Sequence, residues 1–299
     1  MASDFRPTGV LVPLVTPFDE SGSVDLASLE TLATEVLRDG ARGVVALATT
    51  GEPTSLDQAE RDAVVATCAG VCAEHGGVLV VGAGTNDTRT TIARHEALAE
   101  VAGVKASLAV VPYYVRPSET AIVAHFQAVA DRSPVPLLVY NIPYRTGRGL
   151  GADALLELAV TDNVVGVKQA VGGIDTDSLR LLAEASERFA VLGGDDPFLY
   201  PLVLMGGNGA IAASSHLCTR RFVRMIDCGL AGQLVEGRLH AEALLPLVQA
   251  LFAEPSPAVI KALLHAEGKL PTPHVRMPLA DASPPALDRA VAALSAAST

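Results

Sequence analysis

Lysine is rare in this sequence, and one lysine stands where it could do covalent chemistry. Among 299 residues there are four lysines, and Lys168 closes the apolar run Val164-Val165-Gly166-Val167-Lys168-Gln169. At the inner end of a buried strand its ammonium would be poorly solvated, which lowers the pKa and supplies a free amine. Such an amine attacks a ketone and forms a Schiff base. The alternative is that Lys168 faces outward and extends its ammonium into water.

The tyrosines supply a partner for that amine. Four of the five fall in one stretch, and Tyr140 ends the apolar run before that of Lys168, at the same predicted level. Schiff-base chemistry on a 2-keto acid needs a group that moves protons on and off oxygen and carbon, and a phenol can do so. The alternative is that Tyr140 is an aromatic plug at the top of the core.

Two further segments could bind carboxylates. The turn Thr49-Thr50-Gly51-Glu52 offers two hydroxyls and free backbone N–H groups. Arg145, on a loop beside a glycine, could hold a second carboxylate with two parallel hydrogen bonds. The alternatives are a simple turn that caps a helix and a surface salt bridge.

The elements that must position these residues alternate along the chain. Short apolar runs without polar alternation are typical of parallel strands buried on both faces. They are Val10–Val15, Val44–Ala48, Val78–Val81, Leu108–Val111, Leu137–Tyr140, Val164–Val167, Ala190–Leu192 and Gly209–Ala213. Helical patterns lie between them, over Asp25–Arg38, Leu56–His75, Thr88–Val101, Glu119–Asp131, Asp153–Leu158, Asp175–Arg188, Pro197–Met205 and Arg220–Asp227.

Eight strand–helix units in about 225 residues favour an α/β fold, a (β/α)8 TIM barrel. An open doubly wound sheet is the alternative, because periodicity does not reveal closure. We predict a catalytic barrel over residues 1–228 and a C-terminal helical domain over residues 229–299, with helices near Gln233–Phe252, Pro257–Glu267 and Pro285–Ala296. Reactive groups of barrels lie at the C-terminal ends of the strands, where the candidates above stand.

Composition excludes several classes of protein. The chain is 49% hydrophobic and 18% charged, too apolar for a disordered protein. A net charge of −11 opposes binding to nucleic acid or anionic membranes. Apolar runs are too short to span a bilayer, and the opening MASDFRPTGV shows no secretion signal. Four cysteines do not make a disulfide scaffold, so we expect a cytoplasmic protein.

Other candidate sites are weaker. Gly82-Ala83-Gly84 lacks the third glycine and the later acid of a dinucleotide site. Asp195 and Asp196 have only His216 near a strand end as a further metal ligand. Cys68 and Cys72 are expected to be small buried apolar groups. We therefore predict no cofactor and no metal.

Taken together, the motifs resemble the dihydrodipicolinate synthase / N-acetylneuraminate lyase family of class I aldolases. They occur in the family's order from Gly9 almost to the C-terminus. The matching segments are Thr49–Glu52, Pro112-Tyr113-Tyr114 with Arg116-Pro117, Tyr140–Pro143 with Arg145–Gly147, Gly166–Lys168, Gly194–Asp196, Glu254–Pro257 and Val275–Leu279.

The resemblance implies roles for these residues. Lys168 would form the Schiff base with pyruvate, and Tyr140, Thr49 and Tyr114 would form a hydroxyl chain for protons. Tyr114 would reach into the active site of the adjoining subunit of a homotetramer, a dimer of dimers.

The substrate-binding residues follow in the same way. Thr50 with the backbone around Gly51 would hold the pyruvate carboxylate, and Arg145 the carboxylate of aspartate-4-semialdehyde. Gly194 and Ile211 would line the pocket.

Within the family, the Thr-Thr-Gly-Glu turn and the Arg-Thr-Gly segment favour the synthase branch over the sialic acid lyases. The expected reaction condenses pyruvate with aspartate-4-semialdehyde to 4-hydroxy-tetrahydrodipicolinate, on the route to lysine and diaminopimelate. Gln169, Tyr144 and Arg148-Gly149 depart from the synthase pattern. They keep open a related aldolase or dehydratase that acts on a sugar acid or a different aldehyde. A catalytically silent ligand-binding paralogue is the alternative of another class.

Regulation is also predicted from the resemblance. Lysine-inhibited relatives carry histidines and a glutamate near the dimer interface, and the matching positions here are Gln58, Arg61 and Thr90, with Pro53 nearby. We therefore expect feedback by lysine to be weak or absent.

Overall fold

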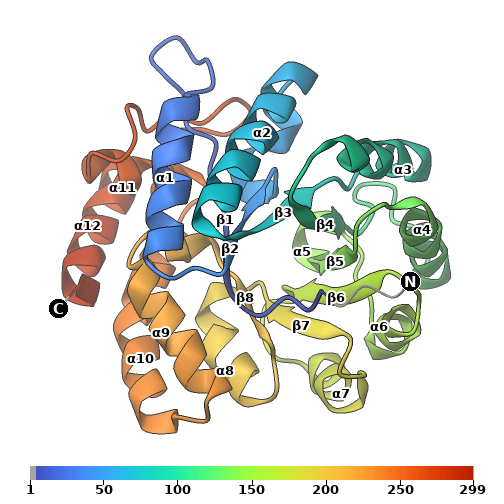
Figure 1. The fold of residues 1–299 in the computed structure, drawn as a ribbon. Helices are drawn as coiled ribbons and strands as arrows, with labels where there is room; N and C mark the ends of the chain where they lie inside the picture. Colours follow the sequence, from blue (N-terminus) through green and yellow to red (C-terminus); the bar gives the residue numbers. More distant parts are fainter. Residues whose placement is uncertain (1–4, 299) are drawn as a thin grey trace.

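Eight parallel strands close into a barrel in which each strand pairs with its neighbours in chain order, and β8 pairs with β1 (Figure 1). The structure is a computed structural model that describes residues 5–298. It confirms the (β/α)8 barrel, and the alternative of an open sheet is wrong. The strands are β1 Gly9–Pro13, β2 Gly43–Ala46, β3 Val78–Gly82, β4 Val104–Val110, β5 Leu137–Asn141, β6 Val164–Gln169, β7 Ala190–Gly193 and β8 Gly209–Ile211.

The barrel helices are α1 Leu26–Arg38, α2 Gln58–His75, α3 Thr88–Glu96, α4 Glu119–Arg132, α5 Pro143–Thr146, α6 Ala152–Ala159, α7 Thr176–Glu184, α8 Leu199–Leu204 and α9 Thr219–Leu230. Short polar side chains cap the N-termini of α1, α2, α3, α4 and α7. Asp25, Asp57, Asp87 and Asp175 each accept a hydrogen bond from the backbone N–H three residues later, which satisfies a donor that the first turn leaves free.

Some predicted boundaries are wrong. β4 begins at Val104, four residues before the predicted start, because exposed Lys105 and buried Ser107 interrupt the apolar pattern. The Ser107 hydroxyl is satisfied by the carbonyl of Pro136. The predicted helix over Thr88–Val101 changes to a 3-10 helix at Ala97, and the short helix α5 was not predicted.

Alternation along β6 decides which side chains enter the barrel. Val167 packs outward in the cluster beneath α4 and α6, whereas Lys168 projects inward. The register pairs Lys168 with Tyr140 of β5, so the two residues lie at one level near the C-terminal ends of their strands. Their predicted common level is confirmed.

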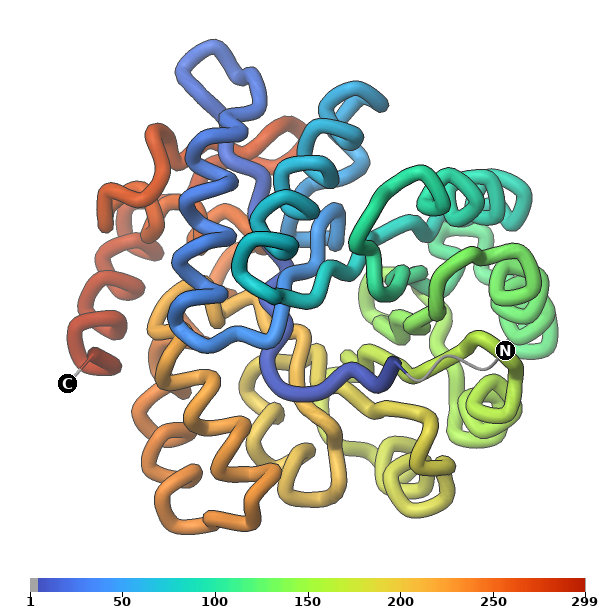
Figure 2. Tube along the Cα trace, in the orientation of Figure 1, coloured from blue at the N-terminus to red at the C-terminus, as the bar shows by residue number. Residues whose placement is uncertain are grey.

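After the barrel, the chain continues as helices α10 Leu234–Leu251, α11 Ala258–Ala266 and α12 Pro284–Ser298, which pack on one another. The segment after α11 lies beside α1 (Figure 2), where Lys269 pairs with Glu35 at 2.8 Å. α9 runs across the expected domain boundary at 228/229, and the division into two units stays a prediction.

Two sequence expectations concern membranes and export. Within residues 5–298, no helix combines the length and apolar character that crossing a bilayer requires. The expected lack of a secretion signal depends partly on residues 1–4, which lie outside the described residues.

Candidate active site

Lys168 is a buried amine at the barrel mouth. The residue is 5% exposed, and its Nζ lies 4.3 Å from the centroid of the Tyr140 ring. Burial lowers the Lys168 pKa to about 8, against a partial opposing effect of Asp196 and Tyr144. About half of the amine is therefore unprotonated near pH 8, compared with well under 1% for an ordinary lysine. The alternative of an outward-facing lysine is wrong.

Tyr140 packs in the barrel interior beside Lys168. It belongs to the cluster that fills the barrel, with Leu138, Leu192 and Ile211, and burial raises the pKa of its phenol. The charge of Arg145 and, to a smaller extent, a hydrogen bond with the Thr49 side chain act in the opposite direction on this pKa. The phenol is therefore neutral at physiological pH and can both donate and accept a proton.

The turn that follows β2 places two threonines at the same end of the barrel. Thr49–Gly51 is a single 3-10 turn, closed by a hydrogen bond from the Gly51 N–H to the Ala48 carbonyl at 2.8 Å. Thr16 donates its hydroxyl to the Gly51 carbonyl at 2.7 Å. Thr50 is 6% exposed. A buried turn tied down in this way can present hydroxyls and N–H groups to an anion.

A cavity of about 290 Å³ opens at this end of the barrel. Thr49, Tyr140 and Arg145 line it together, as predicted, and its described lining includes three arginines and no carboxylate. Arg61 and Arg94 are the other two, and sequence reasoning did not place them in the site. The remaining lining residues are Leu47, Ala48, Pro53, Thr54, Gly82, Gly84, Leu108, Val110, Tyr113, Ile142 and Thr146.

Several predicted site residues lie behind or beside this cavity. Ile211 is fully buried at the end of β8 in the barrel core, and Thr50 and Gly51 lie in the turn behind Thr49. Gly194 lies against Lys168, because a Cβ at position 194 would be 2.8 Å from the Lys168 Cε. These four residues do not form the cavity wall, and Lys168 is likewise not among the residues that line it; Tyr140, next to Lys168, is.

Tyr114 does not line the cavity of its own chain. Its side chain is 88% exposed and its backbone has φ +71°, in the left-handed region. Its neighbour Tyr113 does line the cavity.

Arg145 is oriented by the residue before it. Its Nε donates to the Tyr144 hydroxyl at 3.1 Å, and its guanidinium carbon lies 5.2 Å from the Tyr144 ring centroid. Tyr144 departs from the synthase pattern, and its two contacts restrict the orientation of the Arg145 guanidinium. The cation–π contact leaves other guanidinium N–H groups of Arg145 for a ligand.

Gln169 faces away from the chemistry. Its amide donates to Ser178 on α7 at 3.1 Å and accepts from Asn141 at 3.0 Å. These bonds lie outside the barrel, because neighbouring residues in a strand point to opposite faces. The departure from the synthase pattern at Gln169 therefore lies in a buried polar network and not in the cavity wall.

The residues considered for metals and nucleotides have other roles. Asp196 accepts from the Ser214 N–H at 2.7 Å, and Asp195 from the Gly172 N–H at 2.6 Å. Burial raises the pKa of both carboxyls, and their charges favour the protonated form of Lys168. At Gly82 and Gly84 a Cβ would meet neighbouring backbone at 2.2 and 2.6 Å, so these glycines allow close strand packing.

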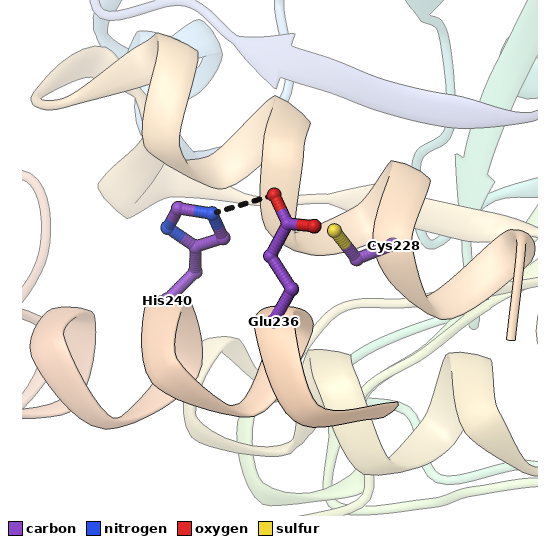
Figure 3. Close-up of side chains that lie close together, drawn as sticks. All are labelled: Cys228, Glu236 and His240. Carbon is purple, nitrogen blue, oxygen red and sulfur yellow. Dashed lines mark ion pairs between the residues drawn. The ribbon is translucent and has the colours of Figure 1, made fainter. Parts of the chain in front are cut away.

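One other group of possible metal ligands lies on α9 and α10, where Cys228, Glu236 and His240 have ligand atoms within 4.8 Å of one another (Figure 3). Glu236 is already paired with Arg224 at 2.6 Å. Burial raises the pKa of the Cys228 thiol, and burial with nearby Arg221 lowers that of His240. Two arginines beside the cluster oppose a cation, so the cluster does not make a metal centre.

The fold and the site define the protein's class. A parallel (β/α)8 barrel with a desolvated lysine at the C-terminal end of β6, beside a neutral tyrosine, is a class I aldolase, a lyase that works through a Schiff base. The chain belongs to the Dihydrodipicolinate synthetase family, whose sequence profile matches residues 6–297.

Individual relatives agree with this membership. A protein of Neisseria meningitidis serogroup B named 4-hydroxy-tetrahydrodipicolinate synthase is 38% identical over 271 residues, covering 91% of this chain and 92% of its own. The dihydrodipicolinate synthase of Thermotoga maritima superposes with a TM-score of 0.94 at 30% identity, covering 98% and 99% of the two chains. The enzyme of Acinetobacter baumannii, solved with pyruvate, gives 0.93 at 30% identity, covering 97% and 99%.

Proposed function

We propose that this chain acts as a 4-hydroxy-tetrahydrodipicolinate synthase, which condenses pyruvate with aspartate-4-semialdehyde. The observation that carries the proposal is the buried Lys168 Nζ, 4.3 Å from the Tyr140 ring centroid, at the end of a strand. Relatives at 35–38% identity over most of the chain bear this name.

The first stage joins pyruvate to the enzyme. The neutral amine of Lys168 attacks the ketone carbon, and the carbinolamine loses water to form an imine. The phenolate that Tyr140 becomes on giving a proton to the leaving water then takes a methyl proton, which gives an enamine and restores the phenol. Tyr140 supplies the proton that leaves with the water, and its hydrogen bond with Thr49 provides the path for proton exchange. The Thr49–Gly51 turn holds the pyruvate carboxylate through Thr50 and the backbone around Gly51.

The second stage forms the new carbon–carbon bond. The enamine carbon attacks the aldehyde carbon, and the resulting alkoxide takes a proton from the Tyr140 phenol, which regains it from the amino group as the ring closes. Arg145 binds the semialdehyde carboxylate at the cavity wall. The amino group of the adduct then attacks the imine carbon, closes the ring and displaces Lys168 as the free amine. The reaction is balanced without a cofactor.

The assembly and the location of the protein belong to the same proposal. We expect a homotetramer, a dimer of dimers, in the cytoplasm. The exposed Tyr114 supports this, because its hydroxyl could complete the proton chain of an adjoining subunit.

Borohydride reduction in the presence of pyruvate tests the first stage. The expected result is a covalent adduct that peptide mass spectrometry maps to Lys168. Absence of an adduct would favour the silent paralogue. Turnover across a panel of aldehydes and sugar acids then tests the second substrate, and aspartate-4-semialdehyde should give the highest kcat/KM. A preference for another aldehyde would favour the related aldolase, with Tyr144 as the residue that reshapes Arg145.

A further inference from the structure

A fully buried ion pair connects the C-terminal helices to the active-site turn. Lys261 on α11 places its Nζ 2.9 Å from Oε1 of Glu52, and the two side chains are 0% and 1% exposed. The residues are 209 positions apart in the sequence. A buried ion pair is weak evidence for stability, because desolvation of both charges offsets their attraction. Its location therefore matters more than its strength.

The second carboxylate oxygen of Glu52 is also occupied. Oε2 accepts the backbone N–H of Arg276 at 2.8 Å. Lys261 in turn lies over the ring of Phe18, with its Nζ 4.0 Å from the centroid, and Phe18 belongs to the loop after β1. Both ends of the ion pair are thus held by further contacts, which leaves the Glu52 side chain one orientation.

Glu52 is also the residue that ends the catalytic turn. Its backbone is left-handed, with φ +52°, which residues with a Cβ adopt rarely. Its N–H donates to the Thr49 carbonyl at 3.2 Å, and its own carbonyl accepts from the Ser55 N–H at 3.0 Å. A left-handed backbone at a residue with a Cβ persists only when surrounding contacts hold it. The contacts of the Glu52 side chain therefore help to fix the conformation of the Thr49–Gly51 turn that precedes it.

We propose that Lys261 and Glu52 are positioning residues, which hold the Thr49–Gly51 turn in the geometry that binds the carboxylate of the 2-oxo acid substrate. This inference rests on the proposed function, in which that turn receives pyruvate. Neither residue touches the cavity. Their effect reaches the substrate through the backbone of the turn.

The alternative is that the pair only stabilises the fold. Removing one partner leaves an uncompensated buried charge, which destabilises either way. The double variant Lys261→Met/Glu52→Gln removes both charges with little change in volume, so its stability should return toward that of the wild type. Substrate binding in this double variant then separates positioning from stability.

The experiment measures the pyruvate concentration that gives half-maximal borohydride trapping at Lys168. The double variant should unfold cooperatively and need about tenfold more pyruvate, because small misplacements of binding groups lower reactivity strongly. Glu52→Gln keeps the shape of the side chain and a hydrogen bond, and it should need about threefold more. The KM for the semialdehyde should stay within about twofold of the wild type in both.

A matched control uses the other lysine that joins this region to the barrel. Lys269→Met breaks the half-exposed pair with Glu35 on α1, which does not involve the Thr49–Gly51 turn, and should trap pyruvate like the wild type. If the double variant and Glu52→Gln both reach half-maximal trapping at the pyruvate concentration of the wild type, the inference is overturned. If the double variant does not fold, Glu52→Asp decides instead, because it keeps the charge opposite Lys261 but shortens the side chain that holds the turn, and wild-type trapping by it would overturn the inference. Failure of the wild-type protein to trap pyruvate would instead overturn the proposed function.

Discussion

Gly194, which directly follows β7, lies against the side chain of Lys168 on the neighbouring strand β6. A Cβ on Gly194 would lie 2.8 Å from Cε and 2.9 Å from Cγ of Lys168, and 3.0 Å from the Cβ of Ala170. The space that a side chain would occupy at residue 194 is the space in which the reactive lysine lies.

Gly194→Ala should therefore displace the amine. We expect borohydride trapping of pyruvate at a fixed subsaturating concentration to fall about tenfold or more, because the added methyl pushes Lys168 from the ketone. Gly173→Ala is the matched control, since its Cβ would meet nothing within 4 Å. Equal trapping by Gly194→Ala and the wild type would show that Lys168 moves without consequence.

The rate of Schiff-base formation should depend on the ionisation of Lys168. Its pKa is lowered to about 8 by burial, so the free amine, and with it the trapping rate at low pyruvate, should increase as pH rises through about 8 and then level off. Samples taken at several times and reduced with borohydride at each pH of a series measure this rate. A rate that keeps rising toward the pKa of an ordinary lysine, about 10.4, would contradict the role of burial.

Arg145→Ala should affect chiefly the second substrate. The kcat/KM for aspartate-4-semialdehyde should fall about 10- to 100-fold, the effect of losing a charged hydrogen-bonding partner. Pyruvate trapping should change much less, and its midpoint pH should rise, because the charge of Arg145 helps to lower the pKa of Lys168. Lys168→Ala should abolish both. Arg148→Ala serves as the control, because Arg148 is exposed on the same loop and does not line the cavity.

Tyr144→Phe tests the orienting contact separately. It removes the hydroxyl that accepts a hydrogen bond from the Arg145 Nε, and it keeps the aromatic ring. We expect a loss of a few-fold in kcat/KM for the semialdehyde, smaller than that of Arg145→Ala. A gain in activity would indicate that Tyr144 narrows the aldehyde site.

Lysine should inhibit weakly or not at all. Arg61 and Arg94 lie in the cavity wall, and among the described residues neither forms an ion pair with an acid. Burial lowers the pKa of Arg94, and the charge of Arg61 acts in the same direction. Two arginine charges in one wall repel the ammonium groups of lysine. Steady-state assays with added lysine measure this, and a micromolar inhibition constant would contradict the prediction.

Local sequence determined the strand cores, the capped helices and the position of Lys168 and Tyr140 at strand ends. These depend on alternation, apolar runs and caps, all of which act over a few residues. The direction of Gln169 follows from the same alternation once Lys168 is placed inward, although it was not drawn from the sequence. Polar residues inside β4 show the limit, because Lys105 and Ser107 break the pattern without breaking the strand.

Tertiary structure alone decided closure, register and the contacts between distant segments. The pairing of β8 with β1 depends on hydrogen bonds across about two hundred residues, which no local pattern encodes. Gly194 meets Lys168, and Lys261 meets Glu52, only because the barrel and the C-terminal helices bring those segments together. Lys168 and Tyr140 could be identified from the sequence because residue type and position at the end of an apolar run are local features. The pKa of Lys168 and the direction of the catalytic turn depend on burial and packing, which exist only after the chain has folded.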